Sequence, residues 1–422
     1  MLVSCRLMPS SLMLQIVVVV LVARALAFVL RRFGQSVVIA EMAAGFLLGP
    51  AVLGAALPGL HAAIFPPAGL GGLAALGDIG LTLFMLVIGA EIGSTERAGS
   101  PGRRAAVLVG VLALAVPAAL ALLVAPYVRP YAGSGVAAGP FAAFFALCLA
   151  TSAVPVMARI LKDRGQSDTV AGAVALGAAG VGDVAVWIAL PLIVGYASAH
   201  ADVGAAALRL GGLVALGAFG CFILRPVLAA RLPALVRRNG PAGVGVMIVG
   251  GLAFAATTAA LGLHAVFGAF LFGLCLPRTP DVRRRLEDAV LPLSTLVLMP
   301  CFFAAAGLGT SAHGLALGPG LFALVFALAV GGKLTGGALG ARMAGCSGAT
   351  SLRVAVLVNT RGMMELVVIK LGLDAGLIGP ELFTVLFVMA IATTAMTGPL
   401  LDRLDHLERV RLRRGAASMS LR

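Results

Sequence analysis

Long apolar segments recur along the whole chain, and short polar stretches that carry most of the charged residues separate them. A helix needs about 20 apolar residues to cross the hydrocarbon core of a bilayer. Thirteen segments qualify, a few of them short or broken by glycine, and they cover residues 13–30, 37–55, 73–93, 105–126, 138–158, 169–198, 205–224, 242–262, 264–277, 288–309, 315–341, 354–373 and 382–401. Because a spanning segment must satisfy its own backbone polar groups, the pattern predicts an all-α polytopic membrane protein with about 13 transmembrane helices.

The composition also indicates a membrane protein. Hydrophobic residues make up 60% of the 422 positions and charged residues only 11%, whereas a soluble domain carries about a quarter charged residues. The 55 glycines fit close helix packing in lipid, where small residues let backbones approach. No small-residue cleavage site marks the first apolar run, so we expect a retained helix and not a signal peptide.

The net charge of +14 reflects a one-sided distribution of Lys and Arg and not a surface for nucleic acid. With the C-terminus in the cytoplasm, 24 of the 31 basic residues fall on the inner side, 4 fall on the outer side, and Arg24, Lys333 and Arg361 lie inside spans. This split follows the positive-inside rule and requires an odd number of spans. We therefore expect a multi-pass protein of the cell membrane with its N-terminus outside, a transmembrane domain over residues 1–401 and a short basic cytoplasmic tail over residues 402–422. The tail is either solvated or a short amphipathic helix on the membrane surface.

One carboxylate lies near the middle of the sixth span, in the stretch GAAGVGDVAVW. Charge inside a span costs roughly 2.5–3.5 kcal/mol on insertion scales, so Asp183 marks a functional site by default. A lone carboxylate at that depth is expected to be neutral unless it has a partner. Lys333, in the otherwise apolar stretch FALAVGGKLTGGALG, is the best available partner, and a purely structural ion pair is the alternative. The other charges within or beside spans are Arg24, Glu41, Asp78, Glu91, Arg361 and Glu365.

The fifth span contains residues that interrupt a regular helix. Its sequence ALCLATSAVPVMARIL places Thr151, Ser152 and Pro155 inside the span. Proline removes one backbone hydrogen bond and disfavours the helical region for the residue before it. Exposed backbone at mid-membrane is tolerated only where it lines a cavity or is buried in protein, so we predict a broken helix there.

The twelfth span has a similar interruption, since AVLVNTRGMMELVVI holds Asn359, Thr360, Arg361 and Gly362. The two spans are seven apart and so cross the membrane in opposite directions, as an inverted repeat requires. Paired interrupted segments in two halves are the best sequence indication of a transporter's binding site, and two unrelated kinks are the alternative. Half-helix ends carry partial charges. We expect Arg361 and Glu365, which are one turn apart, to neutralise the partial charges at the second break. Only Thr, Ser and Pro are available at the first break.

Several stretches together indicate a family resemblance that covers nearly the whole chain. They are RRFGQSVVIAEMAAGFLLGPAVLG, IGLTLFMLVIGAEI, TSAVPVMARIL, GAAGVGDVAVWIAL, HAVFGAFLFGLCLPR, MPCFFAAAGL and VNTRGMMELVVIKLGLDAGLI. They resemble the bacterial monovalent cation:proton antiporters, a sodium/hydrogen exchanger-like group related to potassium efflux antiporters and plant cation/proton exchangers. The resemblance implies the sodium/proton antiporter fold, an inverted repeat with two crossed interrupted helices. It also implies interleaved dimerisation and core subdomains, and a membrane homodimer whose core moves like an elevator.

The resemblance further implies roles for single residues. Asp183 matches the second acid of the family's paired DD, ND or QD motif, and Lys333 matches a lysine that can pair with it. Thr151 and Ser152 lie at the crossover. Gly182 departs from the family pattern, because that position usually holds Asp, Asn or Gln. With a single acid, electroneutral exchange of one proton for one cation becomes the expectation, with weak transport or a changed substrate as alternatives.

Together these features predict a secondary active antiporter that exchanges Na⁺ or K⁺ for protons by alternating access. Asp183 is expected to bind either a proton or a dehydrated cation. Thr151, Ser152, backbone carbonyls and water are expected to complete the shell, since hard cations prefer oxygen ligands. No cofactor, resident metal or nucleic acid is implied. The supporting residues are Lys333, Gly182, Pro155, Asn359, Thr360, Arg361 and Glu365.

Other classes of function stay open at this point. A cation-coupled symporter of a small organic solute is one, because bile-acid-type symporters share the crossed-helix plan. A potassium efflux system is another; such systems typically carry a nucleotide-binding domain, and the roughly twenty residues after Leu401 would require a separate regulatory subunit to supply it. A membrane sensor without transport is a further alternative. An enzyme has no support, because five dispersed His residues form no HExxH motif and neither GxSxG nor a P-loop occurs.

Overall fold

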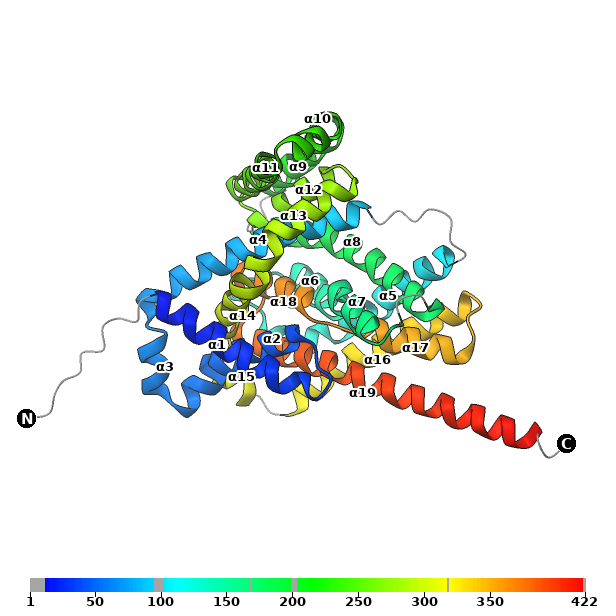
Figure 1. The fold of residues 1–422 in the computed structure, drawn as a ribbon. Coiled ribbons are helices and arrows are strands. Elements are labelled where there is room, and N and C mark those ends of the chain that lie inside the picture. Colours follow the sequence, from blue (N-terminus) through cyan, green and yellow to red (C-terminus); the bar gives the residue numbers. More distant parts are fainter. Residues whose placement is uncertain (1–11, 95–101, 167–168, 199–202, 317–318, 420–422) are drawn as a thin grey trace, which may run out of the picture.

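The computed structural model describes residues 12–94, 102–166, 169–198, 203–316 and 319–419, and over these ranges the chain is largely helical (Figure 1). Within them, ten helical stretches are long and apolar enough to cross a membrane. Three shorter apolar helices, Ala138–Ala150, Ala265–Cys275 and Gly348–Val358, lie in the fifth, ninth and twelfth predicted spans. Every predicted span therefore contains a helix or a pair of helices, and the predicted fold class is confirmed.

One group of helices carries both interrupted spans. The helix α5 lies at its centre and packs against α6, α8 and α16, while α16 also packs against α17 and α19. The members are α5 (Arg103–Val128), α6 (Ala138–Ala150), α7 (Val154–Asp163), α8 (Val170–Ser198), α16 (Pro319–Met343), α17 (Gly348–Val358), α18 (Met363–Asp374) and α19 (Pro380–Met419).

A second group is built around α4, which packs against α12, α13 and α14, while α14 also packs against α2. The members are α1 (Leu12–Arg31), α2 (Val37–Leu48), α4 (Leu70–Ser94), α11 (Gly240–Ala260), α12 (Ala265–Cys275), α13 (Pro280–Leu293), the π-helical segment η5 (Ser294–Leu298) and α14 (Met299–Leu308). The helices α9 (Val203–Ala218) and α10 (Arg225–Arg238) connect α8 to this group (Figure 1). Both groups thus draw on the two halves of the sequence.

Glycines bring α2 and α14 into backbone contact. A Cβ added to Gly45 would lie 2.1 Å from the carbonyl oxygen of Phe303, and one added to Gly307 would lie 1.8 Å from the carbonyl oxygen of Gly45. Small residues allow this approach between membrane helices, where dispersion contacts replace the hydrophobic effect as the main attraction. The glycine-rich composition therefore has a direct structural use at this contact.

Substituting Gly45 by alanine is expected to lower the free energy of unfolding by about 1–3 kcal/mol, because the backbone of α14 would have to move. Gly71→Ala is the matched control, since a Cβ at this helical glycine meets no atom within 4 Å. Thermal melting of the purified variants in detergent measures the difference. Equal melting temperatures would contradict the close approach of α2 and α14.

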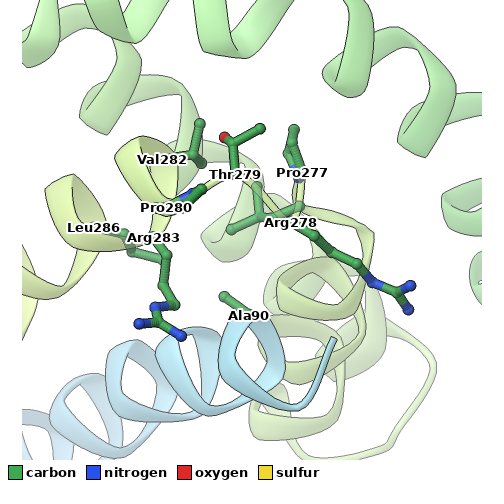
Figure 2. A pocket seen from close by; sticks show the side chains of 9 residues that line it. Ala90, Pro277, Arg278, Thr279, Pro280, Val282, Arg283 and Leu286 are labelled. Carbon is green, nitrogen blue, oxygen red and sulfur yellow. The ribbon is translucent and has the colours of Figure 1, made fainter. Parts of the chain in front are cut away.

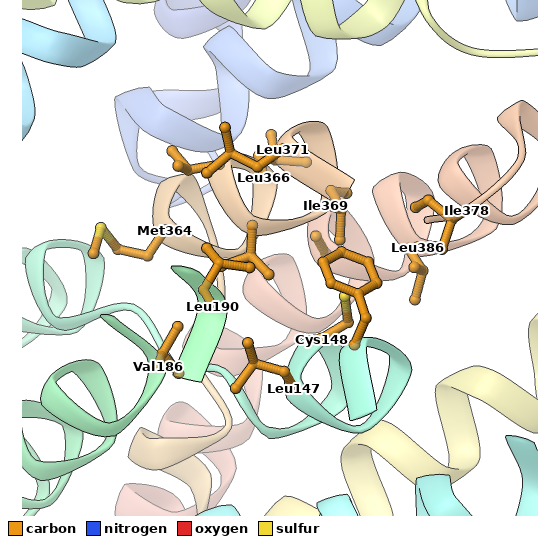
Figure 3. Close-up of a cluster of buried hydrophobic side chains, with 14 of the residues drawn as sticks. Leu147, Cys148, Val186, Leu190, Met364, Leu366, Ile369, Leu371, Ile378 and Leu386 are labelled. Carbon is orange, nitrogen blue, oxygen red and sulfur yellow. The ribbon is translucent and has the colours of Figure 1, made fainter. Parts of the chain in front are cut away.

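The interrupted helices are anchored in an apolar core. Figure 3 shows side chains of α6, α8, α18 and α19 meeting in one cluster of buried residues. The apolar side chains hold the helix ends of the breaks against α8. Among them are Leu147 and Cys148 on α6, Val186 and Leu190 on α8, Leu366 and Ile369 on α18, and Leu386 on α19.

The last span continues beyond its predicted end. The helix α19 runs without a break through residue 401 to Met419, because no glycine or proline follows Pro399 until Gly415. The start of the tail is tied to other helices by ion pairs from Arg164 to Asp402 (2.9 Å) and from Arg353 to Asp405 (2.6 Å). Up to Met419 the tail is therefore an extension of the last spanning helix and not a separate surface helix.

Candidate functional site

Both predicted helix interruptions are present. Residues 151–153 separate α6 from α7, and residues 359–362 separate α17 from α18. Pro155 lies in the first turn of α7, where its missing N–H has no helical partner to lose. Gly362 has φ +149°, a conformation that L side chains rarely adopt, and a Cβ there would lie 2.8 Å from Val156. A proline at the start of α7 and a glycine with positive φ before α18 thus fit the two interruptions of the helices.

The two breaks are bonded to each other. The backbone N–H of Ala153 donates to the carbonyl oxygen of Thr360 at 3.0 Å, and the hydroxyl of Ser152 donates to the carbonyl oxygen of Val358 at 2.9 Å. Buried backbone groups need such partners. Each break therefore satisfies polar groups of the other, and the crossing is a fixed junction.

Arg361 corrects one expectation from the sequence. Its guanidinium reaches across the junction and donates to the carbonyl oxygens of Cys148 (2.9 Å) and Leu149 (2.5 Å), at the C-terminal end of α6. The same guanidinium pairs with Glu365 at 2.8 Å, and both side chains are fully buried. A helix C-terminus carries partial negative charge, and a guanidinium has enough donors for two carbonyls and a carboxylate. Arg361 thus neutralises an end of the first interrupted helix and not of its own.

Glu365 lies as the sequence suggests. It is in the first turn of α18, where a carboxylate compensates the partial positive charge of the helix N-terminus. At the first break, the partial negative charge of the helix end is therefore compensated by Arg361, from the second half of the chain. At the second break, the partial positive charge of the helix end is compensated by Glu365 of the same helix.

Lys333 is buried and its ammonium donates to the carbonyl oxygen of Ala150 and to Ser152 Oγ, the latter at 2.6 Å. Together with Arg361 it occupies the last three carbonyl oxygens of α6. The described residues show no ion pair between Lys333 and Asp183, although the lysine charge acts electrostatically on this acid. An ammonium has three donors. One donor of Lys333 is therefore left beyond the two bonds at α6.

Asp183 is 3% exposed on α8 and makes no hydrogen bond or ion pair within the described part of the chain. A buried charge without partners is costly, so such a carboxylate binds a proton or a cation. A Cβ added to the preceding Gly182 would meet no atom within 4 Å. The glycine thus leaves open space next to the acid, at the position where the resembling family has a polar side chain.

The remaining predicted site residues also lie at the crossing. The hydroxyl of Thr151 donates to the carbonyl oxygen of Leu147 at 2.8 Å, which leaves its oxygen lone pairs available. Thr360 Oγ1 contacts Thr397 Oγ1 at 3.4 Å. Asn359 is fully buried, and neither polar atom of its side chain has a hydrogen-bond partner.

Arg24 and Glu41 pair with each other away from this site, whereas Glu91 acts on it. Arg24 pairs with Glu41 at 3.2 Å and donates to the carbonyl oxygens of Thr295 (2.9 Å) and Leu296 (3.1 Å) in η5. Glu91, on α4, acts electrostatically on Asp183 and was not expected in the site. The separation of Glu91 and Asp183 in the sequence gives no indication of this interaction.

A pocket of about 200 Å³ opens elsewhere, between Ala90 at the end of α4 and the loop that joins α12 to α13 (Figure 2). Arg278, Thr279 and Arg283 are among its lining residues. None of the predicted site residues lines it. The crossing of the interrupted helices, and not this pocket, therefore unites the chemistry that the sequence singled out.

Comparison with known proteins agrees with the fold. The family described as "Sodium/hydrogen exchanger, transmembrane" matches residues 17–404. The chain is 33% identical over 404 residues to Cation/H(+) antiporter 17 of Arabidopsis thaliana, covering 92% of this chain and 48% of the plant protein, so it spans about half the length of that relative. It is 31% identical over 406 residues to the Na(+)/H(+) antiporter NhaS4 of Synechocystis sp., covering 92% and 96%. Its fold is similar to that of the sodium proton antiporter MjNhaP1 from Methanocaldococcus jannaschii, with a TM-score of 0.63, 13% identity and coverage of 92% and 95%.

Proposed function

The chain belongs to the sodium/hydrogen exchanger family, and from this premise we propose that it is a secondary active antiporter exchanging a monovalent cation, Na⁺ or K⁺, for protons. The observation that carries the proposal is Asp183, a buried carboxylate without a partner in the described structure, close to the crossing of two interrupted helices. NhaS4, which the chain matches over nearly its full length, is named for Na⁺/H⁺ exchange. Interrupted helices that meet near mid-membrane are a common site of ion binding in transporters.

Exchange follows from competition for Asp183. The carboxylate binds a proton or a dehydrated cation, and each bound state crosses between the two sides of the membrane. Lys333 and Arg361 each bring one positive charge, and Asp183 and Glu365 each bring one negative charge. These four groups therefore carry the same net charge of +1 whether Asp183 holds a proton or a monovalent cation. Equal charge in both transported states supports electroneutral, one-for-one exchange.

The cation's ligands are oxygen atoms, because hard cations prefer them. Asp183 supplies the carboxylate and Thr151 Oγ1 supplies free lone pairs. Ser152 contributes less than the sequence suggested, since its hydroxyl already donates to Val358 and accepts from Lys333. When neither a proton nor a cation is bound, the remaining donor of Lys333 pairs with Asp183 and stabilises its charge.

The proposed setting is a homodimer in the cell membrane with the C-terminus in the cytoplasm and the N-terminus outside. The excess of Lys and Arg in alternate loops and in the tail supports this orientation. The family resemblance supports the dimer, with residues 1–401 as the transport domain and residues 402–422 as a basic tail. Alternating access is a movement of the helix group that carries the crossing relative to the group built around α4.

Proton flux in liposomes tests the proposed function. The purified protein is reconstituted, and the internal pH is recorded when Na⁺, K⁺ or Li⁺ is added outside. An antiporter is expected to raise the internal pH of acid-loaded liposomes with at least one of these cations, while protein-free liposomes do not respond. No cation-dependent proton movement with any of the three would contradict the proposal.

Substituting Gly182 by aspartate is expected to make exchange sensitive to membrane voltage, because it adds a second proton carrier beside Asp183. The open space at Gly182 allows the side chain to be accommodated. Gly180→Asp is the matched control, since a Cβ at that half-buried glycine also meets no atom within 4 Å. Exchange rates in liposomes are compared at imposed membrane potentials of opposite sign. A voltage-independent Gly182→Asp variant, or an equal response of both variants, would count against the single-carboxylate account.

A further inference from the structure

Asn359 occupies an unusual position for an amide side chain. It is 0% exposed, and both Oδ1 and Nδ2 lack a hydrogen-bond partner. Leaving a buried polar group unsatisfied costs about 1–3 kcal/mol, and buried polar groups in proteins are nearly always paired. Within the described residues no other buried side-chain amide has both polar atoms unpaired. If this side chain only filled space at the break, the protein would be more stable with apolar atoms in place of the amide.

The position of Asn359 in the chain places it inside the junction. Its neighbours Val358 and Thr360 both accept hydrogen bonds from the first break, at Ser152 and Ala153. The backbone N–H of Asn359 is used in α17, where it donates to Ala355 at 3.2 Å. The backbone N–H of Asn359 is therefore committed, whereas its side chain is not.

The packing of α8 against α17 relates the position of Asn359 to that of Asp183. The helices α8 and α17 touch, and Ala179 and Val358 belong to one cluster of buried residues. Asp183 follows Ala179 by four residues, on the same face of α8, and Asn359 follows Val358 directly. Asp183 on α8 and Asn359 directly after α17, whose side chains have no hydrogen-bond partner in the described structure, thus belong to two segments that pack against each other.

We infer that Asn359 is a cation-binding residue of the exchanger, and that its amide oxygen joins the Asp183 carboxylate around the transported monovalent cation. This inference rests on the proposed exchange function. An amide oxygen is a hard, neutral ligand that does not titrate. A proton needs only Asp183, whereas a dehydrated cation needs several oxygen atoms. Asn359 therefore contributes to the affinity for the cation and not to the number of protons exchanged.

Substitution by leucine separates a binding role from a structural one, because leucine has the same branched arrangement of side-chain heavy atoms and no polar atoms. Asn359→Leu is expected to fold, with a melting temperature in choline buffer equal to or above that of the wild type, since two unpaired polar groups are removed. Its KM for Na⁺ or K⁺ in liposomes is expected to rise about tenfold or more at constant pH. Thr397→Val, which removes the hydroxyl next to Thr360, controls for disturbance of the break and is expected to keep the KM within about twofold of wild type.

Two results would overturn the inference. One is an Asn359→Leu variant with the wild-type KM. The other is a variant that fails to fold or melts at a lower temperature, because the amide would then be a structural requirement. Failure of the proposed function is a separate outcome, since it shows as absence of exchange by the wild type in the same liposomes.

Discussion

Asp183→Asn is expected to reduce cation-driven proton movement in liposomes by roughly two orders of magnitude or more, because we propose that this carboxylate carries the proton. Asparagine has nearly the same volume, so packing around α8 stays intact. It neither binds a proton at working pH nor balances the charge of a bound cation. The protein is therefore expected to remain folded, with an unchanged elution volume in detergent, while exchange with Na⁺, K⁺ and Li⁺ disappears.

Asp78→Asn provides the matched control for this variant. Asp78 is a carboxylate on α4 that is exposed in the described structure and is not among the charges that act on Asp183. Its substitution is expected to leave most of the exchange activity in place. Exchange by Asp183→Asn at the wild-type rate would contradict the assignment of Asp183 as the ion-binding carboxylate. Loss of exchange in both variants would show that exchange is sensitive to the loss of any carboxylate, and not to Asp183 in particular.

Arg361→Met is expected to lower the free energy of unfolding by about 3–5 kcal/mol, because removing one partner of a buried ion pair leaves the other uncompensated. Glu365 would lose its cation, and the carbonyl oxygens of Cys148 and Leu149 would lose their donor. The double variant Arg361→Met/Glu365→Leu is expected to recover part of the loss, since it removes the unpaired charge but not the unpaired carbonyls. Thermal melting in detergent measures all three proteins.

Arg164→Met is the control for the loss of an arginine. Arg164 pairs with Asp402 at 2.9 Å and with Asp405 at 3.6 Å, but its side chain is 22% exposed and water can replace the lost partners. An exposed ion pair contributes up to about 1 kcal/mol. Equal losses of stability in Arg361→Met and Arg164→Met would contradict the role of Arg361 as the buried cap of α6.

The spans and both helix breaks could be predicted from the sequence because the bilayer restricts the possible structures. A spanning segment must be long, apolar and helical, so hydropathy alone locates it. The residues Thr151 to Pro155 and Asn359 to Gly362 interrupt two such segments with polar and helix-breaking side chains, which indicates local structure directly. Asp183 and Lys333 stood out for the same reason, as rare charges in apolar surroundings.

The partners across the crossing could not be predicted in this way, because they depend on how distant helices pack. Nothing in the spacing of Arg361 indicates that its guanidinium bonds the carbonyls of Cys148 and Leu149, more than 200 positions earlier. The hydrogen bonds of Ser152 with Lys333 and Val358 likewise depend on tertiary packing, as does the electrostatic effect of Glu91 on Asp183. The pattern thus identified residues that meet at the crossing, and the packing assigned their partners.

Competition between proton and cation at Asp183 is tested most directly by the pH dependence of the cation KM. Uptake of radioactive Na⁺, or of K⁺ if that is the better substrate, is measured in liposomes with equal pH on both sides. If one proton competes with one cation, the KM is expected to rise about tenfold for each unit of decreasing pH in the acidic range, while the maximal rate stays constant. A KM that does not change with pH, or one that rises about a hundredfold per pH unit as two competing protons would require, would contradict exchange at a single carboxylate.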